Sequence, residues 1–176
     1  MKKQIMIPGV TLAIIALTTL VYIVPNYSSA QAIEIDMYEF GYTVKDGSQP
    51  LHIIAGKEYT FYIRNIGGVE HEFMIVKDPE RVNSDLKNLV KSYLDMGMTF
   101  EEIYEALEGE HHELEEAWSE ENIFIDVLRL GPGESDSFTV KIDSPGTYYI
   151  VCLVLKGSAP DTHLDRGMIM ELNVTS

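Results

Sequence analysis

The sequence predicts an all-β fold, a β-sandwich that carries one helical insertion. Short stretches of alternating apolar and polar residues, such as Tyr59 to Ile66, have the two-residue period of half-buried strands. Turn residues separate about seven or eight such stretches, which favours a sandwich. Between Glu80 and Asn122 the period changes to the three-four spacing of amphipathic helices. The chain is long enough for one domain with a sizeable core.

The N-terminus has the features of an export segment. Met1-Lys2-Lys3 is basic, an uncharged and mostly apolar run extends from Ile5 to Val24, and Ala30-Gln31-Ala32 has the A-x-A pattern of a cleavage site. The apolar run, at about twenty residues, is also long enough to span a bilayer. We therefore expect residues 1–32 to be either a signal peptide or a membrane anchor that forms a hydrophobic helix. Residues 33–176 would then form an extracytoplasmic domain, in the periplasm or at the cell surface.

The first half of the domain is expected to consist of strands. Alternation from Ile33 to Met37 predicts the first strand, and a change of the apolar face predicts a β-bulge near Glu39 or Gly41. Leu51 to Ile54 and Tyr59 to Ile66 predict two more strands. Gly67-Gly68 then turns the chain into a strand that carries His71.

The insertion, at about residues 80–122, is expected to hold two helices. Ser84 is a candidate N-cap for the first helix, which Gly97 would stop. Thr99 and Glu102 have the spacing of a capping box for the second helix. Between Glu80 and Asn122 there are 13 acidic and 3 basic residues, so this segment holds most of the net charge of −15.

Strands are expected to resume after the insertion. Residues 123–130 are apolar on both faces, with Ile123, Ile125 and Val127 on one face, so this strand is expected to be buried on both sides. Residues 137–142 predict another strand, and Tyr148 to Val151 predict the strand that ends at Cys152. Residues 169–174 predict the closing strand.

Charge limits the range of partners. With 13 basic against 28 acidic residues, the chain lacks the basic face that binding to nucleic acid requires. A protein partner with a basic docking patch is more plausible. The membrane would be a second partner through the N-terminal helix, if that helix is not cleaved.

Four residues form a candidate metal site. Cys152, the only cysteine, is followed by His163 and Met168 in C-x10-H-x4-M order, and His71 lies in an earlier strand. A thiolate, two imidazoles and a weak thioether are the ligands of a blue-copper centre. Met170, which would lie on the same strand face as Met168, is the rival axial ligand.

The chain from Ile33 to Val174, apart from the insertion, resembles the cupredoxin family of small blue copper proteins. The more specific pieces are the stretch from Asn65 to His71 and the loop from Cys152 to Met168. The resemblance implies a Greek-key sandwich with one type 1 copper ion at one end. It further implies that His71, Cys152 and His163 are the strong ligands and that Met168 is the axial ligand.

The resemblance also implies a function: the transfer of single electrons between extracytoplasmic redox partners, without enzymatic activity. Copper delivery, or a structural role in a membrane complex, is one alternative. A copper-dependent reductase or oxidase is the other, although such enzymes need more copper-binding histidines and the chain has five histidines in all. The ten residues between Cys152 and His163 exceed the short loops of plastocyanin or azurin and are nearer those of copper nitrite reductases.

Overall fold

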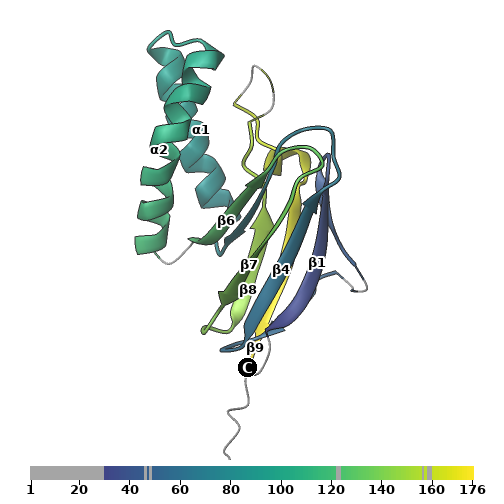
Figure 1. Cartoon of the computed structure of the whole chain (residues 1–176). Helices are drawn as coiled ribbons and strands as arrows, with labels where there is room; N and C mark the ends of the chain where they lie inside the picture. The colour runs from purple at the N-terminus through teal and green to yellow at the C-terminus, as the bar shows by residue number, and fades with distance from the viewer. Residues whose placement is uncertain (1–29, 46, 48, 122–123, 156, 158–159) are drawn as a thin grey trace, which may run out of the picture.

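The computed structural model describes residues 30–176 except residues 46, 48, 122–123, 156 and 158–159, and these residues form two mixed β-sheets flanked by two long helices (Figure 1). One sheet has the strand order β2-β1-β4-β7 and the other the order β3-β9-β8-β5-β6. The strands are β1 (Gln31–Tyr38), β2 (Gly41–Val44), β3 (Leu51–Ile54), β4 (Glu58–Asn65), β5 (His71–Val76), β6 (Phe124–Leu130), β7 (Ser135–Lys141), β8 (Gly146–Val151) and β9 (Ile169–Thr175). The helices are α1 (Pro79–Asp95), α2 (Phe100–Glu120) and the 3-10 turn η1 (Leu164–Arg166). The predicted all-β sandwich with a helical insertion is confirmed.

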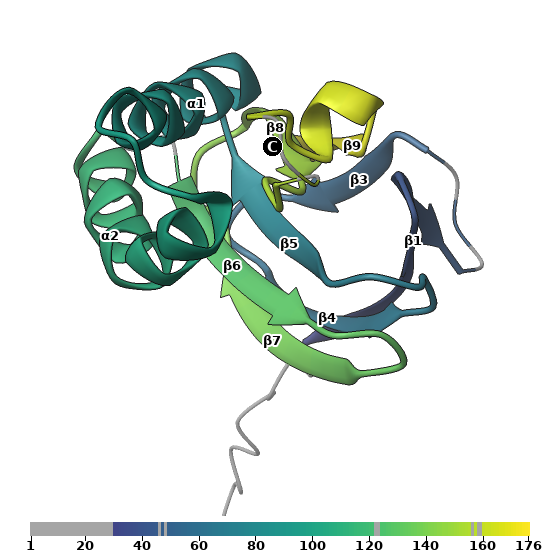
Figure 2. The same ribbon diagram turned by 90° about the horizontal axis from the view of Figure 1, so that it is seen from above.

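Two apolar clusters hold these layers together. The larger cluster fills the space between the sheets and includes Phe61 and Phe73, neither of which is exposed. The second cluster lies between the outer face of the five-stranded sheet and the helices, and it includes Met74, Leu86 and Trp118. Figure 2 shows the helices beside β5 and β6. All six residues of β5 are buried because the sandwich core covers one of its faces and the insertion covers the other.

The start of the domain is a hairpin. β1 and β2 pair antiparallel, and Tyr38 lies opposite Gly41, so the chain reverses at Glu39-Phe40. The predicted bulge near Glu39 or Gly41 is therefore wrong. The apolar pattern changes face there because a tight turn begins a new strand.

The helical insertion begins earlier than its predicted cap. Asp78 is the N-cap of α1, since its side chain accepts a hydrogen bond from the N–H of Arg81, and Pro79 follows at the first helical position. Ser84 lies inside the helix, so its predicted role as N-cap is wrong. Thr99 and Glu102 form the predicted capping box of α2, which is confirmed.

β6 packs apolar residues on both faces, but most of the strand is only half-buried because it lies at the edge of its sheet, so the predicted burial on both sides is wrong. Ile123 lies outside the described residues, and the other apolar residues are arranged differently from the prediction. Ile125 and Leu128 pack against the core between the sheets, whereas Phe124 and Val127 pack against the helical cluster. The pairing of β5 with β6 shifts register between Ile75 and Val76. An extra residue at such a shift changes the alternation of side chains, which the strict two-residue period did not predict.

The predicted N-terminal signal peptide or anchor lies almost wholly outside the described residues, which begin at residue 30. β1 begins at Gln31. Among the residues that the structure describes, no helix combines the length and the apolar character needed to cross a bilayer.

Candidate metal centre

Two strand ends and the residue before η1 bring three of the predicted ligands together. His71 is the first residue of β5, and Cys152 directly follows β8, the antiparallel neighbour of β5. Because antiparallel neighbours run in opposite directions, the start of one strand lies beside the end of the other. His163 precedes η1 and is tied to Cys152 by a hydrogen bond of 2.8 Å from the N–H of Leu164 to the carbonyl of Cys152.

The donor atoms of these three residues converge. The Nδ1 atoms of His71 and His163 are 3.1 Å apart, and the Sγ of Cys152 is 3.4 Å from the Nδ1 of His163. All three donor atoms lie within 4.8 Å of one another, and all three residues are buried.

These separations fit a single metal ion. With metal–nitrogen bonds of about 2.05 Å and a metal–sulfur bond of about 2.3 Å, a tetrahedral site has about 3.3 Å between nitrogens and about 3.5 Å between nitrogen and sulfur. A hydrogen bond could account for either contact singly, but both contacts meet at the Nδ1 of His163, which has only one proton or one lone pair to offer. Two imidazoles and one thiolate suit copper, so the donor set fits one type 1 copper ion.

Met168 lies next to Cys152 and His163 in the structure. Its N–H donates to the carbonyl of His163 at 3.1 Å, and its carbonyl accepts from the N–H of Cys152 at 3.3 Å. Gly167, with φ of +92°, supplies the left-handed turn that returns the chain from η1 to this position. Met170 is also buried, but it pairs with Ile150 of β8. Ile150 lies two residues before Cys152, so Met170 is about 6.6 Å further along the strand from the ligand end of the sheet. The backbone therefore favours Met168 over Met170 as the axial ligand. The assignment of Met168 as the axial ligand stays a prediction.

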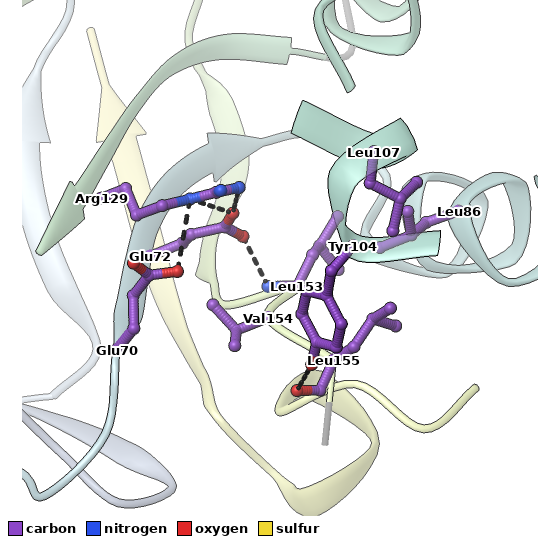
Figure 3. Close-up of a pocket in the computed structure, with 9 residues that line it drawn as sticks. All are labelled: Glu70, Glu72, Leu86, Tyr104, Leu107, Arg129, Leu153, Val154 and Leu155. Atoms are coloured by element: carbon purple, nitrogen blue, oxygen red, sulfur yellow. Dashed lines mark hydrogen bonds and ion pairs between the residues drawn. The ribbon is translucent and has the colours of Figure 1, made fainter. Parts of the chain in front are cut away.

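Glu72 links the two ligand strands behind the site. Its N–H donates to the Sγ of Cys152 at 3.3 Å, and its carboxylate accepts from the N–H of Leu153 at 3.0 Å. The same carboxylate forms an ion pair with Arg129 of β6 (Figure 3). The Glu72 side chain is 1% exposed, so this ion pair neutralises a charge that water hardly reaches. Hydrogen bonds of this kind orient ligands and tune a bound metal.

A cavity of about 220 Å³ lies beside this ion pair. Glu72 and Arg129 line it on the side of the sheet, and Leu86, Tyr104 and Leu107 line it from the helices (Figure 3). The insertion therefore lies directly over the residues that follow Cys152.

The turn before β5 packs against the His71 ring. A Cβ atom on Gly67 would lie 2.8 Å from the Nε2 of His71, so a larger residue would fit only if the ring or the turn moved. Asn65 holds this turn, since its side-chain amide donates to the carbonyls of Val69 and Leu130, and its side-chain oxygen accepts from the N–H of Gly67. The Nε2 atom of His71 is buried and has no hydrogen-bond partner within the described part of the chain. Packing against the turn and the Nδ1 contact with His163 therefore position this ring.

Burial shifts the protonation of the ligands in the metal-free protein. It lowers the pKa of His71, which keeps the imidazole neutral, although the charge of Glu39 opposes this shift. Burial raises the pKa of the Cys152 thiol well above its usual range, and the charge of Glu72 raises it further. A metal ion must therefore displace the thiol proton when it binds.

Phe40, in the turn between β1 and β2, covers His163. The two rings meet edge to face with their centres 5.4 Å apart, and His163 is only 4% exposed. Phe40, Gly67, Glu72 and Arg129 were not predicted as site residues. Nothing in a strand pattern distinguishes Glu72 from other acidic residues, whereas the Gly67-Gly68 turn shortly before His71 was a visible signal.

The fold is that of the cupredoxins, as the solved structures described below show, and the His-Cys-His group lies at one end of it, where β5 begins and β8 ends. This confirms the resemblance inferred from the sequence at the level of the fold. No protein-family profile and no curated protein matches the sequence.

Solved auracyanin structures share this fold. Sodium-dithionite-reduced auracyanin from the photosynthetic bacterium Roseiflexus castenholzii is 22% identical, with a TM-score of 0.51 over 84% of this chain and 99% of that chain. Auracyanin A, described as a "blue" copper protein from Chloroflexus aurantiacus, is 21% identical, with a TM-score of 0.52 over 84% of this chain and 100% of that chain. Auracyanin B is also 21% identical, with a TM-score of 0.54 over 86% of this chain and 93% of that chain.

Proposed function

We propose that this protein is a one-electron carrier that holds a single type 1 copper ion through His71, Cys152, His163 and Met168. The observation that carries this proposal is the convergence of three buried donor atoms within 4.8 Å at one end of a cupredoxin sandwich. Copper bound by such a set cycles between its monovalent and divalent forms.

The residues of the chain keep this ligand set in place. Two strands of one sheet supply His71 and Cys152, and main-chain hydrogen bonds tie His163 and Met168 to Cys152. The N–H of Glu72 donates to the thiolate sulfur, which stabilises the charged form of the ligand. Ligands that are fixed in this way need little rearrangement when the oxidation state changes.

Burial of the donors supports a resident ion over copper delivery. None of the three donor residues is more than 4% exposed, and Phe40 lies against His163. A delivery protein must give up its metal to a partner, which exposed donors make easier. The carrier is therefore the better interpretation.

The proposed carrier works outside the cytoplasm and meets a redox protein with a basic patch. The basic and apolar segment of residues 1–24 supports export, and the net charge of −15 supports attraction to a positively charged partner. Ile66 and Val69 are exposed on the turn that leads to His71, and they offer an apolar contact close to the site.

The absorption spectrum of the copper(II) protein tests this proposal. We expect an intense visible band from sulfur-to-copper charge transfer that disappears on reduction and is absent in Cys152→Ser. The band should also be lost or altered in His71→Ala, for which His52→Ala is the matched control, since His52 is an exposed histidine on β3 and its loss should leave the band unchanged. A colourless protein that still binds copper(I) tightly would refute the carrier and favour delivery.

A further inference from the structure

The loop that carries His163 is held by the helical insertion as well as by the sandwich. Leu153 and Leu155, at the start of the loop, belong to the apolar cluster of the helices, and Leu164 packs against the same cluster. Tyr104 of α2 donates a hydrogen bond of 2.8 Å to the carbonyl of Leu155 (Figure 3). Ten residues separate Cys152 from His163, and part of this length is used to reach the helices.

The residues on either side of His163 form a local frame. The Thr162 N–H donates to the Asp165 carboxylate at 2.9 Å, and the Asp165 N–H donates back to the Thr162 hydroxyl at 3.3 Å. This reciprocal pair has the pattern of a capping box, and His163 lies inside it.

Helix α1 binds both members of that frame. The Asn83 side chain accepts from the Thr162 hydroxyl at 2.8 Å and donates to the Asp165 carboxylate at 2.9 Å. Lys87, one turn further along α1, contacts both oxygens of the same carboxylate at 3.0 and 3.2 Å. Thr162 is fully buried, so water does not easily replace the hydroxyl contact.

We infer that Asn83 and Lys87 are positioning residues for the metal centre, through which helix α1 fixes the orientation of His163. This inference rests on the proposed function, since the copper ion is the group that His163 would bind. The acidic insertion then has a role within the protein that is independent of any docking partner. Residues that orient a ligand from outside the coordination sphere typically change metal affinity by about 10- to 100-fold when removed.

The helix supplies matched controls for each substitution. Asn88 is an exposed asparagine on α1, and Lys91 pairs with Asp95 of its own helix instead of with the ligand loop. Asn83→Ala and Asn88→Ala remove the same chemical group from one helix, and Lys87→Ala and Lys91→Ala remove the same charge. Only the first member of each pair loses its contact with Asp165.

The test measures copper(I) affinity by competition with a chelator, together with the reduction potential. We expect Asn83→Ala to lower the affinity about tenfold or more and to shift the potential, with a smaller effect for Lys87→Ala and none for either control. Equal values for Asn83→Ala and Asn88→Ala, or changes that only parallel the melting temperatures of the metal-free variants, would overturn the inference.

Failure of the inference can be told apart from failure of the proposed function. Absence of the visible band in the unmodified protein contradicts the carrier, whereas unchanged affinity in a coloured Asn83→Ala variant contradicts only the positioning role. The NMR signals of the His163 ring in the metal-free protein provide a readout that needs no copper. They should show one conformation in the unmodified protein and conformational averaging in Asn83→Ala; a single unchanged set of signals in Asn83→Ala would count against the inference.

Discussion

Substitution of Arg129 should destabilise the protein more than substitution of Glu72, although the two residues form one ion pair. The Glu72 side chain is 1% exposed, whereas that of Arg129 is 43% exposed. In Arg129→Met the carboxylate stays buried and, within the described part of the chain, keeps the N–H of Leu153 as its one hydrogen-bond donor. In Glu72→Gln the amide oxygen can still accept from Leu153, and the guanidinium can turn to water or to Glu70, which lies 3.8 Å away.

The magnitude follows from this asymmetry. Removing one partner of a fully buried ion pair costs about 3–5 kcal/mol. Because Arg129 is partly exposed and water can enter in its place, we expect about 2–3 kcal/mol for Arg129→Met. Loss of one ordinary hydrogen-bonded contact costs about 1 kcal/mol, which is the value expected for Glu72→Gln. The double variant should be more stable than Arg129→Met, since it leaves no buried charge.

Urea unfolding of the metal-free protein, followed by circular dichroism, measures these differences. Glu70→Gln is the control, since Glu70 is half exposed and its loss should change the free energy of unfolding by less than about 0.5 kcal/mol. A smaller loss for Arg129→Met than for Glu72→Gln would refute the reasoning, because it would mean that the carboxylate does not depend on the guanidinium.

Three other outcomes can be measured. Gly67→Ala should displace the His71 ring, because the new Cβ would lie 2.8 Å from Nε2. We expect copper affinity, measured by chelator titration, to fall by more than tenfold. Unchanged affinity would mean that the turn can move away from the ring. The metal-free protein should lose stability as pH rises above about 8.5, by up to about 1.4 kcal/mol per pH unit, because the unfolded chain releases the Cys152 proton that burial retains in the folded state. Urea unfolding at several pH values measures this slope, and Cys152→Ala should reduce it; an equal slope would assign it to other groups. Met168→Leu should shift the reduction potential of the copper protein more than Met170→Leu, and the reverse order would make Met170 the axial ligand.

The sequence predicted the parts of the fold that depend on local patterns. The strand that carries His71 and the capping box at Thr99 were both found, because alternation and cap spacing are properties of neighbouring residues. The hairpin at Glu39-Phe40 was mistaken for a bulge, since both features change the apolar face and only the pairing of strands distinguishes them. Asp78-Pro79 also fits the start of a helix. The cap was nevertheless predicted at Ser84, because the regular apolar spacing is clearest after that residue.

The site was predicted as a set of ligands but without the residues around them. Soft donors in family order can be recognised from the sequence, and the structure brings His71, Cys152 and His163 together. Glu72 contacts residues 80 and 81 positions away, at Cys152 and Leu153, and Asn83 contacts residues about 80 positions away. Contacts at this separation depend on how the sheets and helices pack, so one sequence without that packing does not reveal them.

The long loop between Cys152 and His163 and the helical insertion are two additions to a small sandwich, and each depends on contacts with the other. Leu153 and Leu155 are 1% and 6% exposed because the helices cover them, as they cover Met74 and Val151 on the outer face of the sheet. Without the insertion these side chains would face water, at a cost of about 1.5–3 kcal/mol for each large apolar residue. A loop with such an apolar side needs the insertion for burial, and the insertion in turn reaches Thr162 and Asp165 beside His163. The inner surface of the helices thus contacts both the outer face of the sheet and the loop that carries His163.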